Sequence, residues 1–142
     1  MPSLPNRHTI FILLLVLCVP QTIAVTPAPE GVKLYIISPV NGDQITGPFT
    51  VRFGLQGMGV APAGVERDKT GHHHLLIDVN EMPAMDMPLP SDERHRHFGG
   101  GQTEVELDLP KGKHTLQLVL GDKDHIPFSP ALVSDKITIT VK

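Results

Sequence analysis

Short segments in which apolar and polar residues alternate are the feature that most constrains the fold of this chain. Residues 103–109 read TEVELDL, and residues 136–141 read KITITV. Strict alternation gives a β-strand one apolar face and one polar face, whereas a helix needs a period near 3.6. No segment has a convincing helical period, so the sequence predicts an all-β protein.

Turn residues divide the chain into further short segments of the same kind. About seven strands, each with one apolar face, are best accommodated by two packed sheets, and we expect an immunoglobulin-like β-sandwich. Without Trp, and with one cysteine, it is not an antibody-type domain. A hairpin is expected to join 103–109 to 114–120. The other expected strands are residues 33–38, 44–46, 49–56, 74–79 and 136–141.

The N-terminal residues have the pattern of a secretory signal. Arg7 precedes an apolar run, residues 9–19, that Pro20 ends, and such a run is too short for a membrane span. We expect a signal peptide at residues 1–24, a Pro-rich spacer at 25–31 and the sandwich domain at 32–142. The alternative is a lipoprotein in which Cys18 is lipidated, although the residues before Cys18 make a poor lipobox.

Cleavage after Ala24 would change both the cysteine content and the net charge of the chain. It removes Cys18, and with it any disulfide or thiolate ligand. It also removes Arg7 from the 12 basic residues and none of the 15 acidic ones, so the remaining chain is acidic. An acidic surface does not attract phosphate backbones, so nucleic acid is not an expected partner, and no membrane span is expected after cleavage.

The eight histidines of the 142 residues are grouped, and the groups are the candidate site. Alternate residues of a strand lie about 6.5–7 Å apart on one face, so two imidazoles at that spacing can chelate one ion. If the strand at 74–79 extends back to residue 72, His72 and His74 share the face of Asp78, and His95 and His97 have the same spacing. Two long connections, residues 57–71 and 80–102, flank this strand and are of a length that is often functional.

Methionines provide a second kind of donor. Thioethers are soft ligands suited to Cu(I), while imidazole suits Cu(II) and zinc. The alternatives are that the methionines fill gaps at the end of the sandwich, that His73 and His114 are structural core histidines, and that His125 lies in a solvated turn. The candidate metal ligands are His72, His73, His74, His95, His97, His114, His125, Met82, Met85 and Met87.

The sequence contains residue types for catalysis without a diagnostic motif. Ser91, Asp92 and His95 are close in sequence, which is not the geometry that a catalytic triad requires. A metal-assisted hydrolase would need Glu81, Asp92 or Glu93 as its base. We do not expect an enzyme.

Several motifs together resemble a known family. These are GMGVAPAG (57–64), GHHHLLID (71–78), HFGGGQTE (97–104), GKHTLQLVLGD (112–122) and HIPF (125–128). They are similar to a family of small exported or periplasmic bacterial proteins catalogued as a domain of unknown function. The resemblance implies a single exported domain whose shared feature is its histidines. This chain departs from the family pattern at Phe128, where many members carry His, and in its methionine run.

We therefore expect a periplasmic or secreted histidine-rich domain that binds a transition metal, copper first and zinc second. The alternative is a non-catalytic interaction or structural module whose partner is an envelope protein. The sequence does not indicate the oligomeric state.

Overall fold

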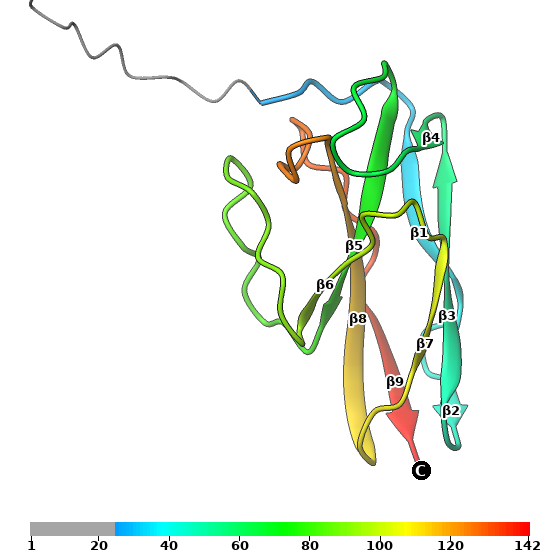
Figure 1. Cartoon of the computed structure of the whole chain (residues 1–142). Coiled ribbons are helices and arrows are strands. Elements are labelled where there is room, and N and C mark those ends of the chain that lie inside the picture. The colour runs from blue at the N-terminus through cyan, green and yellow to red at the C-terminus, as the bar shows by residue number, and fades with distance from the viewer. Residues whose placement is uncertain (1–24) are drawn as a thin grey trace, which may run out of the picture.

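The computed structural model describes residues 25–142, and the expected signal peptide at 1–24 lies outside the described residues. Within this range the chain forms nine strands and no helix. It therefore has no helix there that is long and apolar enough to cross a membrane. Two sheets pack face to face (Figure 1). The predicted all-β sandwich is confirmed.

The smaller sheet has three antiparallel strands in the order β1-β3-β7. They are β1 (Lys33–Ser38), β3 (Phe49–Gln56) and β7 (Glu104–Leu107). Val51 of β3 is fully buried and lies opposite Val105 of β7. The alternation predicted for β3 is confirmed, because Val51 and Phe53 point into the core and Arg52 is exposed.

The larger sheet follows the order β2-β9-β8-β5-β4. One edge of β5 pairs with β8. The other edge of β5 pairs with two short strands, with β4 in parallel at the start of β5 and with β6 in antiparallel near the end of β5. The short strands β4 and β6 lie where the sequence predicted only loops. The members are β2 (Gln44–Ile45), β4 (Gly59–Val60), β5 (Thr70–Ile77), β6 (His95–His97), β8 (Gly112–Gly121) and β9 (Ile137–Val141).

The expected hairpin between residues 103–109 and 114–120 is wrong. β7 pairs with β3 in the smaller sheet, and β8 pairs with β5 and β9 in the larger one. Residues 108–111 carry the chain from one sheet to the other. Both strands still turn their apolar faces into the shared core, since Leu107 and Leu116 are buried together there. The alternation therefore predicted the faces correctly and the pairing incorrectly.

The segment at 25–31, expected to be a Pro-rich spacer, is docked on the domain. The amide of Ala28 donates to the carbonyl of Ser129, and the amide of Ser129 donates to the carbonyl of Thr26, each at 2.9 Å. Pro27 forms a parallel bridge with Ser129. The folded part of the chain thus begins before residue 32.

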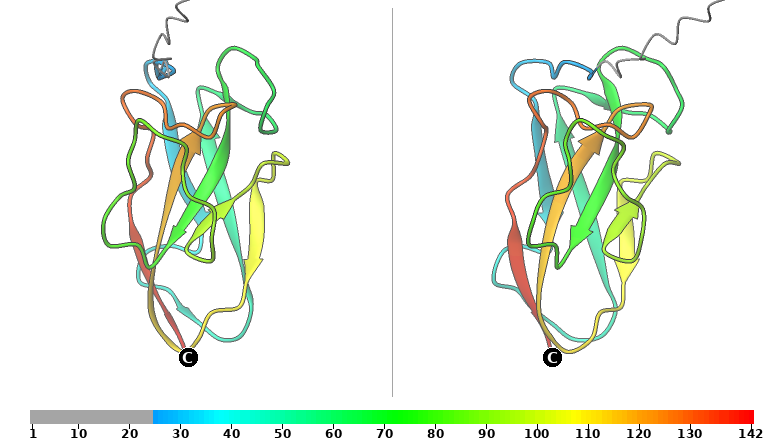
Figure 2. Two further views of the ribbon diagram at one scale, coloured as in Figure 1. Left: turned by 60° about the vertical axis from the view of Figure 1, so that its left-hand side comes forward. Right: turned by 90° about the vertical axis from the view of Figure 1, so that its left-hand side faces the viewer.

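The outer face of the larger sheet, which points away from the smaller sheet, is covered by two connections. Residues 78–94, between β5 and β6, run over this face, and residues 122–128 close its upper end (Figure 2). Leu76, Val119 and Leu89 form a small apolar cluster under the first connection. The amide of Leu89 donates to the carbonyl of His125 at 2.9 Å, which joins the two connections. This covered face holds the histidines described below.

Candidate metal centre

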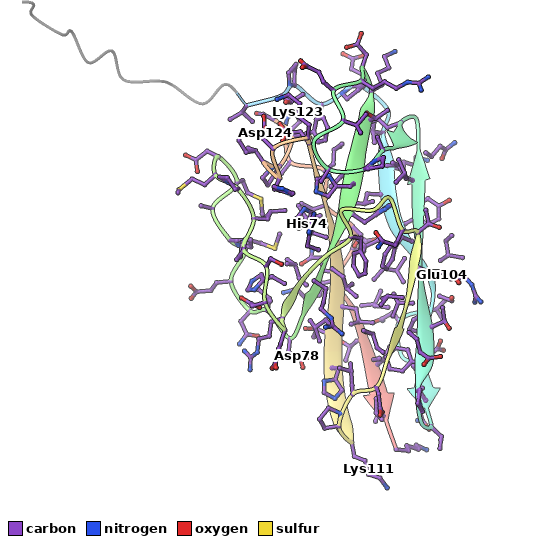
Figure 3. The ribbon with its side chains drawn as sticks, in the orientation of Figure 1. His74, Asp78, Glu104, Lys111, Lys123 and Asp124 are labelled. Carbon is purple, nitrogen blue, oxygen red and sulfur yellow. The ribbon has the colours of Figure 1, made fainter. Side chains whose placement is uncertain are left out.

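Strand β5 sorts three consecutive histidines onto two faces. His73 points inward with Leu75 and Ile77, which belong to the main core. His72 and His74 point to the outer face of the larger sheet, and Figure 3 shows His74 on the side away from the smaller sheet. All three imidazoles are buried, with exposures of 0–1%. The parity argument from the sequence therefore assigned these faces correctly.

Strand β6 brings a third imidazole to the same place. In the antiparallel register of β5 with β6, His97 is the direct partner of His74. Directly opposed residues put their side chains on the same face of a sheet. The ring centroids of His74 and His97 lie 5.1 Å apart.

The fourth imidazole, His125, comes from the connection after β8. Its backbone has a φ of 67°, a left-handed conformation in which His is enriched relative to most residues. The carboxylate of Asp122 accepts hydrogen bonds from the amides of Asp124 (2.9 Å) and Ile126 (3.0 Å), which shapes the turn around His125. The sequence suggested a solvated turn here. The structure instead buries Asp122 and turns His125 over the outer face.

The four imidazoles, His72, His74, His97 and His125, form one cluster. Each offers a ring nitrogen, and no two of these nitrogens are more than 4.8 Å apart. Nε2 of His72 lies 3.1 Å from Nε2 of His74 and 3.1 Å from Nδ1 of His125. In a tetrahedral shell with metal–nitrogen distances of about 2.0–2.1 Å, neighbouring nitrogens are about 3.3–3.4 Å apart. The cluster thus has the size of a first-row metal shell.

Hydrogen bonds within the cluster account for only part of this convergence. An imidazole nitrogen carries either one hydrogen or one in-plane lone pair. Nε2 of His72 therefore has one hydrogen or one lone pair, yet it faces two nitrogens at 3.1 Å. The two contacts must share that single hydrogen or lone pair, so they cannot both be well-aligned hydrogen bonds. A cation among the nitrogens would engage all of these lone pairs at once.

Three of the four imidazoles, those of His72, His74 and His97, are held toward the neutral form that metal ligation needs. Burial, followed by repulsion from the imidazoles of His125 and His97, lowers the pKa of His72 to about 4, although the Asp122 carboxylate acts in the opposite direction. Burial, followed by repulsion from His72 and His97, lowers the pKa of His74 to about 3. The pKa of His97 is lowered by burial and by His125.

Two glycines leave room for the rings. A Cβ on Gly121 would lie 2.9 Å from Nε2 of His74, and a Cβ on Gly99 would lie 2.6 Å from Nε2 of His97. Both separations are below the distance that real Cβ atoms keep from other heavy atoms. Neither Gly99 nor Gly121 was among the candidate site residues identified from the sequence. Gly121 lies opposite His72 in the pairing of β5 with β8, and a glycine opposite a histidine is the signal that could have identified it.

Three other predicted histidines lie outside the cluster. His95 is the partner of Leu76 in the pairing of β5 with β6, two residues from His97. Its Nδ1 contacts the carboxylate of Asp92 at 2.9 Å. Nδ1 of His114 contacts Oδ2 of Asp78 at 2.7 Å. His73 lies in the main core against the ring of Phe53, with centroids 5.1 Å apart.

The three predicted methionine ligands all lie in the connection 78–94. Met82 and Met87 are 38% and 57% exposed, and Met85 is half-buried. The buried donors that the structure brings together are therefore imidazoles. The thioether contribution stays a prediction.

Together these features define a small all-β sandwich with a covered four-imidazole cluster on one sheet. The chain belongs to the family described as Domain of unknown function (DUF4399), whose model matches residues 51–142. This confirms the family resemblance inferred from the motifs. The matched residues include all four histidines of the cluster.

Other comparisons add little about activity. No curated protein matches the chain. Among solved structures, the chain is similar to the endo-β-1,4-mannanase from Thermotoga petrophila, with 18% sequence identity and a TM-score of 0.44. The match covers 78% of this chain and 20% of the mannanase chain. A similarity at this level carries no argument about function.

Proposed function

We propose that this protein binds one transition-metal ion through His72, His74, His97 and His125. The observation that carries the proposal is the convergence of the four ring nitrogens within 4.8 Å of one another. The ligands come from β5, β6 and the connection after β8, so the fold itself assembles the donor set. Hydrogen bonds among the imidazoles satisfy only part of the cluster, whereas a bound cation would engage all four ring nitrogens.

Copper is the ion we propose. Nitrogen-rich sites suit Cu²⁺ and Zn²⁺, and Cu²⁺ binds most tightly in the order of divalent first-row metals. Zinc, which shares the preference for imidazole, is the competitor. A role for Met82, Met85 or Met87 in holding Cu⁺ would add to this site without replacing it.

We propose binding in preference to hydrolysis, because Asp122, the carboxylate that acts on His72, already has hydrogen-bond partners. Both oxygens of Asp122 accept hydrogen bonds, one from backbone amides and one from the hydroxyl of Thr26. Asp92, a candidate base in the sequence, is engaged by His95. A hydrolase needs a base that is free to take a proton from metal-bound water.

The test is a titration of the purified protein, without a histidine tag, with Cu²⁺ and separately with Zn²⁺. We expect one ion per chain and a Kd for Cu²⁺ below about 1 µM, which corresponds to about −8 kcal/mol. Cu²⁺ at about 100 times its Kd should stabilise the fold by about 2.7 kcal/mol, visible as a higher Tm. Binding weaker than micromolar for both ions, or stoichiometry unaffected by His72→Ala, would refute the proposal.

We also propose that the protein works outside the cytoplasm, on the strength of the signal pattern at residues 1–24. Fractionation of cells followed by N-terminal sequencing of the recovered protein tests it. A chain found in the cytoplasm with residue 1 retained would contradict the proposal.

A further inference from the structure

Three of the four cluster histidines lie on paired strands, and His125 does not. His72 and His74 belong to β5, and His97 belongs to β6, so ladder hydrogen bonds hold their backbones. His125 lies in a turn with a left-handed backbone conformation, and its own amide donates to the carbonyl of Asp122 at 3.0 Å. Its position therefore depends on interactions outside the sheet.

The side chain of Asp122 makes those interactions. It is 5% exposed, and each of its two oxygens has a separate task. Oδ1 accepts from the amides of Asp124 and Ile126, which flank His125 on both sides. Oδ2 accepts from the hydroxyl of Thr26 at 2.6 Å. Hydrogen bonds to an ionised, buried acceptor are among the stronger ones in proteins.

Thr26 is itself held in place by the end of the same connection. The carbonyl of Thr26 accepts from the amide of Ser129, and the amide of Ala28 donates to the carbonyl of Ser129, each at 2.9 Å. The docked N-terminal segment is thus joined to the connection after β8 at both Asp122 and Ser129. His125 lies between those two points.

We propose that Asp122 and Thr26 are positioning residues for the metal centre, and that the docked segment 26–29 sets its affinity by fixing His125 over His72. This inference rests on the proposed function. Asp122 acts through His125 and is not itself a ligand. Its buried negative charge, close to the cluster, also favours a cation there. Partners that orient a metal ligand in this way typically change metal affinity by about 10- to 100-fold when they are removed.

The experiment compares four variants in the tag-free full protein with Cu²⁺ as the probe. Asp122→Asn and Thr26→Val should each weaken Cu²⁺ binding by about 10-fold or more. They should also change the electron paramagnetic resonance spectrum of bound Cu²⁺, because one nitrogen ligand is misplaced. Thr26→Ser keeps the hydroxyl and should therefore have the Cu²⁺ affinity and the Cu²⁺ spectrum of the original protein. Asp124→Asn removes an exposed carboxylate from the same turn, where it contacts Lys123, and should bind as the original protein does.

A second measurement separates this inference from the proposed function. In the metal-free protein, Thr26→Val should speed hydrogen exchange of the Ile126 and His125 amides and leave the amides of β5 unchanged. Thr26→Val also serves if Asp122→Asn fails to fold, since it only replaces a hydroxyl with a methyl group of similar size. If the original protein bound no Cu²⁺, the proposed function would fail, and the exchange result alone would decide the positioning role. Unchanged exchange in Thr26→Val, or an unchanged Cu²⁺ spectrum in a protein that binds the ion, would overturn the inference.

Discussion

His74 and His97 lie directly opposite each other in the pairing of β5 with β6, with ring centroids 5.1 Å apart. The pairing spans only three residues of β6, yet it selects which histidine of that strand joins the cluster. A slip by one residue would turn His97 to the other face, since side chains alternate along a strand. The register of this short strand therefore determines the donor set.

The first prediction separates the two histidines of β6. His97→Ala should weaken Cu²⁺ binding by at least about 100-fold, because losing a ligand costs more than losing one of its supporting partners. His95→Ala should leave the affinity nearly unchanged, because His95 contacts Asp92 outside the cluster. Competition with a copper chelator of known affinity measures both. Equal losses in the two variants would place the metal elsewhere.

The second prediction concerns the space beside His74. In Gly121→Ala the new Cβ would lie 2.9 Å from Nε2 of His74, so the buried ring must move away from the cluster. We expect weaker Cu²⁺ binding by about 10-fold, comparable to loss of a partner that orients a ligand. Gly59→Ala is the matched control on β4, where the nearest atom to the added Cβ is Cγ2 of Thr70 at 3.4 Å. A Gly121→Ala variant that binds as tightly as the control would contradict the close packing.

The third prediction uses His73, which is adjacent to two ligands yet turned into the core. Within residues 25–142 neither of its buried ring nitrogens has a hydrogen-bond partner of good geometry, although the backbone of Gln102 lies close to the ring. An unsatisfied buried polar group costs about 1–3 kcal/mol. His73→Leu should therefore raise the free energy of unfolding by about 1 kcal/mol at pH 7.5 and leave Cu²⁺ affinity unchanged. Urea denaturation and the copper titration measure the two, and a loss of copper binding would show that His73 belongs to the centre.

Much of the site could be predicted because strand faces follow from local alternation. The apolar residues Leu75 and Ile77 fix one face of β5, so His72 and His74 must occupy the other. That argument needs no knowledge of the rest of the molecule. It also identified His73 as a residue of the inner face.

What the sequence could not predict depends on distant pairings. His125 reaches the cluster because Asp122 shapes its turn and Thr26 holds Asp122, and these partners are 96 residues apart in the chain. His95 and His97 have the same parity, so only the register with β5 separates them. The crossing of residues 108–111 between sheets was missed for the same reason, since a short turn between two strands usually makes a hairpin.

The last prediction is a pH dependence at the far end of β5 from the metal centre. The ring of His114 has an acceptor at each nitrogen, Oδ2 of Asp78 at 2.7 Å and the carbonyl of Pro110 at 2.7 Å. Both nitrogens can donate only when the ring is protonated. Burial opposes the charge, but the bonds to Asp78 and Pro110 outweigh it, and the pKa of His114 is raised.

A raised folded-state pKa sets the sign of the effect. The stabilisation is fully present below the unfolded pKa of about 6.5 and is lost as the pH rises through the folded value. His114→Gln should lower the free energy of unfolding by about 1 kcal/mol at pH 5.5, a small effect because the pair is partly exposed. The loss should be smaller at pH 9, because less of the His114 ring is protonated there. Lys113→Gln, at the neighbouring exposed position, should show no such trend. Comparing each variant with the original protein at the same pH cancels the contributions of the other histidines, and a destabilisation by His114→Gln that grows toward pH 9 would contradict the protonated pair.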